Sequence, residues 1–201
     1  MILPIDIVMP TMQLPPYSVW DVDGLFPTVV GPTEIEGNAN VRRNFGARQG
    51  EQTYLFFCDD DIILMPGILM KMLGTLLANP SKAYCYCDFI VWNHPCPPHN
   101  WVHRAADFNA ERLRAENYIS TMSLMRRDAF EAVRSGNDLG GFSEEIERLQ
   151  DWELWIKMLK VGLTGIYLPE IGFTATYSGN GITKKDGYKE AADIVRRKHG
   201  L

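Results

Sequence analysis

Three consecutive carboxylates, Asp59, Asp60 and Asp61, follow an apolar run at positions 54–58. Such a run is typical of a strand buried on both faces, and ligands bind at the carboxyl ends of strands in open α/β sheets. Carboxylates about 5 Å apart repel by roughly 3 kcal/mol per pair at an effective dielectric near 20, which a divalent cation would relieve. Oxygen ligands favour Mg²⁺ or Mn²⁺ over Zn²⁺. The triplet therefore predicts a metal site, the alternative being a solvated acidic turn.

A fourth carboxylate, Asp151, lies at the start of a segment, 150–160, whose apolar residues recur at helical spacing. An acid at this position stabilises a helix through its dipole or as a cap, worth about 0.5–2 kcal/mol. It could also be a carboxylate held at a cleft as a general base. The sequence leaves both roles open.

A basic segment precedes the acidic strand end. Thr33, with Glu36 three residues later, predicts the N-cap of a helix over residues 33–48. Within it Arg43 offers a fork of donors that fits the oxygens of a diphosphate. A solvent-facing arginine is an equally good interpretation of this pattern.

The remaining elements alternate between strand and helix. Residues 5–9 predict a first parallel strand that ends at Pro10 and Thr11, where a nucleotide pocket could begin. Further strands are expected at 83–92, 118–125, 164–168 and 173–177, and further helices after Pro66 and at 126–134 and 186–199. Residues 12–32 are expected to be mostly loop, with one strand candidate at 28–30. We expect one α/β domain over residues 1–201, its mostly parallel sheet covered by helices on both faces. Residues 1–92 would be its nucleotide- and metal-binding half and 93–201 its acceptor-binding half.

Composition narrows the class of protein. The 201 residues are 46% hydrophobic and carry a net charge of −5, which gives no reason to expect a nucleic-acid partner. The sequence shows neither a membrane span nor a signal peptide, so a cytoplasmic protein with reduced cysteines is expected.

The segment 94–103 is expected to be an irregular loop, because it is rich in proline. Cys96, His99 and His103 have spacings that a zinc site could use, but finger-like cysteine pairs are missing. A loop that binds an acceptor or closes over it is the better interpretation.

Several motifs occur together in one order. They are the Pro10-Thr11 strand end, the 37–47 segment with Arg43-Asn44, the Asp59–Asp61 triplet, Arg126-Arg127, the 140–145 segment Gly-Gly-Phe-Ser-Glu-Glu, and Asp151-Trp152. In this order they resemble the family 2 glycosyltransferases, inverting enzymes with the GT-A fold that use nucleotide-sugars. The resemblance covers nearly the whole chain.

The resemblance implies a role for each matching residue. Pro10, Thr11, Arg43, Asp59 and Asp60 would line the nucleotide site. Asp59 and Asp61 would be the metal-site carboxylates, with Asp61 on the Mn²⁺ or Mg²⁺ that bridges the diphosphate. Asp151 would be the base that deprotonates an acceptor hydroxyl. The implied reaction moves a sugar, from a UDP-sugar as first choice, to a carbohydrate or other hydroxyl acceptor.

The chain departs from the family pattern in places. The second strand with paired acids, one of which reads the nucleobase, is missing, and Asp21, Asp23 or Glu34 could substitute. Gln150 stands where relatives often carry Glu, and residues 177–181 contain no His for the metal. Two other functions therefore stay open: a nucleotide-sugar-binding domain without turnover, and a metal-dependent nucleotidyltransferase.

Overall fold

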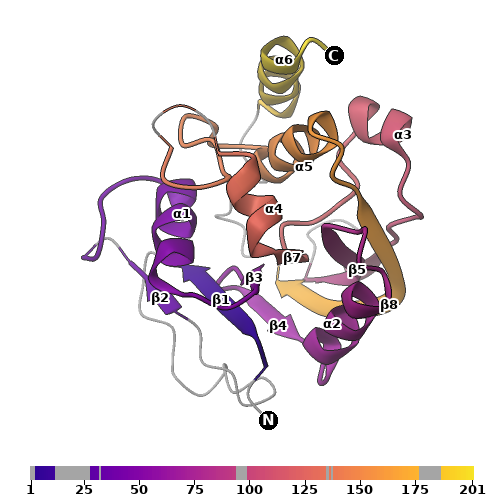
Figure 1. Cartoon of the computed structure of the whole chain (residues 1–201). Helices are drawn as coiled ribbons and strands as arrows, with labels where there is room; N and C mark the ends of the chain where they lie inside the picture. The colour runs from indigo at the N-terminus through magenta and orange to yellow at the C-terminus, as the bar shows by residue number, and fades with distance from the viewer. Residues whose placement is uncertain are drawn as a thin grey trace.

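The structure, a computed structural model, describes residues 3–11, 28–31, 33–93, 99–134, 136, 138–176 and 187–201. These residues form a twisted eight-stranded sheet with helices on both faces (Figure 1). The strands are β1 (Ile5–Pro10), β2 (Thr28–Val30), β3 (Tyr54–Phe57), β4 (Ile62–Leu64), β5 (Tyr84–Trp92), β6 (Trp101–His103), β7 (Leu124–Arg126) and β8 (Gly165–Thr176). The helices are α1 (Ala39–Gln49), α2 (Ile68–Ala78), α3 (Ala110–Ala115), α4 (Arg127–Ala132), α5 (Gln150–Lys160) and α6 (Tyr188–His199).

The strand order is β2-β1-β3-β7-β5-β8-β4, with β6 paired to the outer part of β5. β1 runs parallel to β2 and β3, and β5 runs parallel to β8. β7 lies between β3 and β5 and is antiparallel to both, so β1, β2, β3, β5 and β8 share one direction. The expected α/β fold with a mostly parallel, helix-covered sheet is confirmed.

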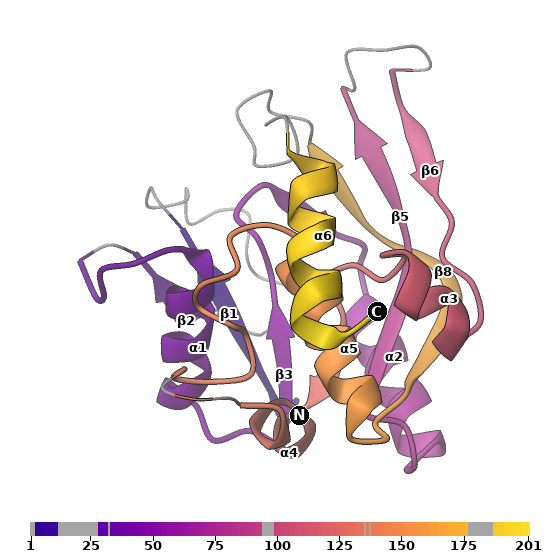
Figure 2. The same cartoon turned by 90° about the horizontal axis from the view of Figure 1, so that it is seen from above.

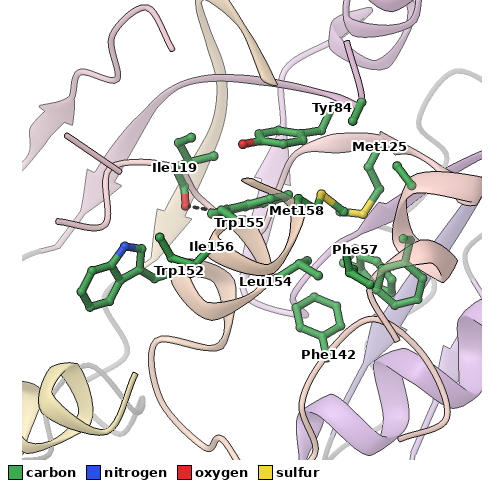
Figure 3. Packing of buried hydrophobic residues seen from close by; sticks show 14 of the residues in the cluster. Phe57, Tyr84, Ile119, Met125, Phe142, Trp152, Leu154, Trp155, Ile156 and Met158 are labelled. Atoms are coloured by element: carbon green, nitrogen blue, oxygen red, sulfur yellow. Dashed lines mark hydrogen bonds between the residues drawn. The ribbon is translucent and has the colours of Figure 1, made fainter. Parts of the chain in front are cut away.

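The buried strand β3 supplies side chains to two hydrophobic cores. Tyr54 and Phe56 face the core that α2 covers, whereas Leu55 and Phe57 face the core under α4 and α5. Phe57 packs edge-on against Phe142 with ring centroids 5.0 Å apart (Figure 3). Because both faces of β3 are buried, the strand carries an apolar residue at every position.

Helix α5 is fixed by its two tryptophans, which bury their rings and donate to backbone oxygens. Trp152 Nε1 donates to Leu113 O at 2.6 Å. Trp155 Nε1 donates to Ile119 O at 3.0 Å, as the dashed line in Figure 3 marks. Trp155 also stacks on Tyr84, with centroids 4.3 Å apart. These contacts fix the position of the helix start, where Asp151 lies.

The predicted start of the basic helix is wrong. α1 begins at Ala39, and Asn38 is its N-cap: Asn38 Oδ1 accepts from the backbone N–H groups of Asn40 and Val41. Glu34 does not extend a helix from Thr33, because its carboxylate accepts from Gly31 N at 2.7 Å within a local turn. Asparagine is also the stronger capping residue of the two candidates.

Several strand predictions also need correction. The two short strands at 164–168 and 173–177 are one strand, β8, whose pairing with β5 is irregular near Pro169, and that irregularity breaks the sequence pattern. Residues 118–123 are not a strand, and pairing begins only at Leu124. The segment 94–103 is not a loop throughout, since β6 pairs with β5. Residues 94–98 lie outside the described part of the chain.

Figure 2 shows the pair β5–β6 extending beyond the body of the molecule, and α6 lying across the face that also carries α5. None of the helices in the described ranges is long and apolar enough to cross a membrane.

Replacing Asn38 by Ala should lower the free energy of unfolding by about 1–2 kcal/mol, because two N–H groups of α1 lose their acceptor. Asn38→Ser, which retains a capping oxygen, should lose clearly less in the same urea titration. Equal stability of the Ala and Ser variants would contradict the capping role.

Candidate functional site

The carboxyl ends of β1 and β3 bring the predicted nucleotide residues together. Pro10 ends β1, and Thr11 Oγ1 donates to Asp60 Oδ2 at 2.5 Å. The backbone fixes this meeting, since Thr11 N donates to Val30 O and Cys58 N to Val8 O, each at 3.0 Å. Asp60 thus faces the end of β1.

Arg43 is buried and points at the acidic triplet. Its side chain is 4% exposed, and Nη2 forms an ion pair with Asp59 Oδ1 at 2.6 Å. Nη1 donates to Asn40 Oδ1 at 3.0 Å, and the guanidinium lies 5.4 Å from the centre of the Phe142 ring. The alternative of a solvent-facing Arg43 is therefore wrong.

One donor of this guanidinium group is unused. Among the described residues Arg43 Nε is buried without a hydrogen-bond partner. An orphaned buried donor of this kind costs roughly 1–3 kcal/mol. Buried polar groups without a hydrogen-bond partner are typical of functional sites, where the required geometry is kept at a cost in stability.

Asp151 occupies the first turn of α5, as expected, and its Oδ1 accepts from Trp152 N at 2.8 Å. Burial raises the pKa of the Asp151 carboxyl, while hydrogen bonds from Asn117 and Trp152 and the positive charge of Arg43 oppose the rise. A carboxylate with a raised pKa is a stronger base. Arg43 therefore interacts with both carboxylate groups, by an ion pair with Asp59 and through its charge with Asp151.

The pKa of Asp61, the last residue of the triplet, is clearly shifted. Desolvation, followed by the charges of Asp59 and Asp60, raises the pKa of Asp61 to about 6, although much of the residue faces solvent. The end of β8 reaches it, because Thr176 N donates to Asp61 O at 3.3 Å. In the described ranges no group of three or more His, Cys, Asp or Glu side chains converges as a metal site.

The donor set nevertheless fits one mode of cation binding. Asp59 is engaged by Arg43 and Asp60 by Thr11, which leaves Asp61 as the carboxylate best placed to bind a cation. Mg²⁺ is usually held by one or two carboxylates together with substrate phosphates, and relief of the repulsion at Asp61 would favour such binding.

Sequence reasoning missed how the 140–146 segment is attached to α1. Asn40 Nδ2 donates to Ser143 O at 3.0 Å and to Ile146 O at 2.6 Å, and Asn44 Nδ2 donates to Phe142 O at 2.8 Å. The available signal was the spacing of Asn40 and Asn44, four residues apart and so on one helix face. The same Asn40 that holds this segment also orients Arg43.

A second missed feature is a cluster around the buried Glu153, which we call the Glu153 cluster. Glu153 Oε1 accepts from Ser143 Oγ at 2.9 Å and lies 3.0 Å from His199 Nε2 and 3.2 Å from Lys198 Nζ. Lys157 Nζ, on the same helix, donates to Gly141 O at 2.7 Å. The cluster ties α6 to α5 and to the 140–146 segment.

Of the three acids that could substitute as readers of the nucleobase, Glu34 lies in the described structure, beside the ends of β1 and β2. A Cβ added to Gly31 would lie 3.1 Å from Glu34 Oε2 and 3.9 Å from Thr11 O. Asp21 and Asp23, and the 177–181 segment without a histidine, lie outside the described residues.

Comparison with known proteins supports the resemblance. No family model matches the chain. A relative from Haemophilus influenzae, named an uncharacterized glycosyltransferase, is 27% identical over 146 residues, which cover 67% of this chain and 45% of that protein. The chain thus spans less than half the length of this relative.

Two solved structures share the architecture. S. aureus TarS 1–349 in complex with UDP-GlcNAc has a TM-score of 0.67 at 14% identity, covering 96% of this chain and 66% of that one. The mannosyltransferase PcManGT from Pyrobaculum calidifontis, in complex with GDP-Man and Mn²⁺, has a TM-score of 0.56 at 16% identity, covering 98% and 61%. The chain thus shares its fold with TarS and with the mannosyltransferase PcManGT. At these identities the solved structures establish the fold alone, and substrates and activity are inferred from the site.

The raised pKa of Asp61 predicts a pH-dependent change in stability. Because the folded protein holds this proton more tightly than the unfolded chain, ionised Asp61 destabilises the fold above about pH 6, and the effect disappears below its ordinary pKa of 3.8. Asp61→Asn should therefore raise the free energy of unfolding by about 1 kcal/mol at about pH 7.5, after allowance for solvent screening, and leave it unchanged near about pH 3.5. Denaturant titrations at both pH values would check this. Asp107→Asn, at an exposed position, is the control, and an equal gain at both pH values would contradict the assignment.

Proposed function

We propose that the protein is an inverting, metal-dependent glycosyltransferase that moves a sugar from a nucleotide-diphospho-sugar to an acceptor hydroxyl. The observation that carries the proposal is the position of Arg43, which pairs with Asp59 and whose charge also acts on Asp151. Through Arg43, an acidic strand end suited to a donor and a half-buried carboxylate suited to a base would belong to one site.

The donor end is formed by Pro10, Thr11, Arg43, Asp59 and Asp60. A nucleoside diphosphate brings two negative charges or more to a place that already holds carboxylates, so positive groups are needed beside it. Arg43 is one such group, because its buried guanidinium can bind phosphate oxygens by a fork of N–H donors. A UDP-sugar is the proposed donor, and the complex of TarS with UDP-GlcNAc supports this choice.

Asp61, with Asp59 beside it, would hold a divalent cation against the diphosphate. When bound, Mn²⁺ or Mg²⁺ would neutralise the negative charge that develops on the leaving nucleoside diphosphate. The Mn²⁺ in the PcManGT complex supports a metal of this class. Desolvation and then the charges of Asp59 and Asp60 raise the pKa of Asp61, and a cation at this position would offset the repulsion between these charges.

Asp151 is the proposed base. The acceptor hydroxyl oxygen attacks the anomeric carbon, its proton passes to the Asp151 carboxylate, and the bond to the diphosphate breaks as the nucleoside diphosphate leaves. A single displacement from the face opposite the leaving group inverts the configuration at that carbon. The half-buried position at the start of a helix fixed by two tryptophans would hold the carboxylate for this step.

Asp151→Asn should lower the rate of nucleoside diphosphate release in the presence of donor, Mn²⁺ and acceptor by about 10²–10⁴-fold, because the base is lost. Donor affinity should stay within about twofold, since the same change does not touch the diphosphate site. Asp61→Asn should instead weaken donor binding in Mn²⁺. A coupled assay for UDP or GDP release with titration calorimetry measures both quantities, and Asp107→Asn is the control.

The two other functions give different outcomes. A nucleotidyltransferase releases pyrophosphate rather than a nucleoside diphosphate, and a binding domain binds donor without turnover across a broad acceptor panel. Turnover that survives both Asp61→Asn and Asp151→Asn would remove these residues from the mechanism.

Glu34 is the proposed reader of the nucleobase, since its carboxylate accepts from Gly31 N directly after β2, and the neighbouring Val30 O accepts from Thr11 N at the end of β1. Glu34→Gln should weaken binding of the preferred nucleoside diphosphate by about 5–10-fold and reduce the preference between UDP and GDP, because a charged acceptor is replaced by an amide. Glu36→Gln, a nearby change of the same kind, is the control in the same calorimetric titrations. An unchanged preference would assign base reading to other residues.

A further inference from the structure

A cavity of about 540 Å³ lies between the start of α1, the 145–150 segment and the first half of α6. Its volume falls within the roughly 300–1,000 Å³ of small-ligand sites. Among the described residues, Arg43 belongs both to this cavity and to the donor end, and Gln150, directly before Asp151, also lines the cavity. The cavity thus adjoins both the residue next to the proposed base and the donor end.

The wall that α6 supplies is held in place. Ala192 and Val195 bury one side of α6 in the core, while Ala191 and Ile194 face the cavity. At the end of the helix, Lys198 Nζ pairs with Glu145 Oε1 at 2.5 Å and donates to Ser143 Oγ at 2.8 Å. With the Glu153 cluster, these contacts make the cavity a built feature of the fold.

The lining combines apolar and hydrogen-bonding surface. Ala39, Ile146, Ala191 and Ile194 provide aliphatic surface. The side-chain amide of Gln150 offers donors and an acceptor. The amide of Asn38 is already engaged by Asn40 N, Val41 N and Glu144 O. A sugar unit presents C–H groups on its faces and hydroxyls at its edges, and a mixed lining of this kind matches both.

The charges of the lining argue against an anionic ligand. Three carboxylates, those of Glu145, Glu147 and Glu190, line the cavity with the guanidinium groups of Arg43 and Arg148. Arg43 is already paired with Asp59, and Glu145 with Lys198. With all five charged side chains counted, three carboxylates outnumber two guanidinium groups, so the lining is net negative and disfavours a phosphorylated or carboxylated acceptor, whereas hydroxyls can donate to Glu147 and Glu190.

From these observations we infer that the cavity between α1, the 145–150 segment and α6 is the acceptor site, and that it takes an uncharged, hydroxyl-rich sugar unit. The inference rests on the proposed function for its place in the reaction. Binding of a sugar in the cavity can nevertheless be tested without turnover.

The test measures glycoside binding by saturation-transfer NMR in the presence of UDP and Mn²⁺. The probes are the methyl glycosides of glucose, galactose and N-acetylglucosamine, with glucose 6-phosphate as the anionic probe. Ala191→Trp fills the cavity, and Lys189→Trp places the same side chain at an exposed position of α6 that does not line it. Ile194→Trp is the second filling variant, at a residue that is 47% exposed and should tolerate the change.

At least one neutral glycoside should bind the wild type more tightly than glucose 6-phosphate does. Its affinity should fall by about tenfold or more in Ala191→Trp and Ile194→Trp and by less than about twofold in Lys189→Trp. Affinity for UDP, measured by calorimetry, should be unchanged in all three variants. Their circular dichroism spectra should match that of the wild type.

The acceptor assignment is overturned if no neutral glycoside binds the wild type, if glucose 6-phosphate binds better, or if the filled variants bind as the wild type does. Failure of the proposed function is a separate result: it would show as no binding of UDP or GDP in Mn²⁺, whatever the glycosides do.

Discussion

The buried guanidinium group of Arg43 is the interaction on which the arrangement of the site depends. A buried charge is tolerated only when it is paired and hydrogen-bonded, and Arg43 meets this condition through Asp59 and Asn40. Asn40 in turn holds the 140–146 segment, which carries Phe142 under the same guanidinium group. The helix, the loop and the strand end therefore keep their relative positions through one side chain.

The hydrophobic cores supply the rigidity that this polar arrangement needs. β3 contributes to both cores, so its carboxyl end cannot shift without disturbing the packing on two faces. α5 is locked by Trp152 and Trp155, whose ring nitrogens also find backbone acceptors. The carboxylate groups of Asp59 and Asp151, from distant parts of the chain, thus lie at the ends of the well-packed elements β3 and α5, as a preorganised site requires.

Much of this could be predicted from the sequence, and the failures have physical causes. Burial is visible in the sequence at two places, as the apolar run before Asp59 and as the periodic apolar residues after Asp151. The positions of β3 and α5 could therefore be predicted from the sequence. The direction of Arg43 was undetermined because the buried face of α1 is polar, formed by Asn40, Arg43 and Asn44, and hydrophobic periodicity carries no information there. The N-cap was misassigned because Thr33 and Glu36 imitate a capping box. The Glu153 cluster joins residues far apart in the sequence, which local patterns cannot reveal.

The pairing of β4 with the end of β8 has a consequence for how the protein folds. Ile62 lies opposite Ala175, and β7 is inserted between β3 and β5, so strands from the two halves of the chain alternate in one sheet. Contacts between such distant residues require long loops to close first, which slows folding. The backbone oxygen of Asp61 can accept from Thr176 N only when β8 has paired with β4. The position proposed for cation binding is therefore complete only when residues from both halves of the chain have come together.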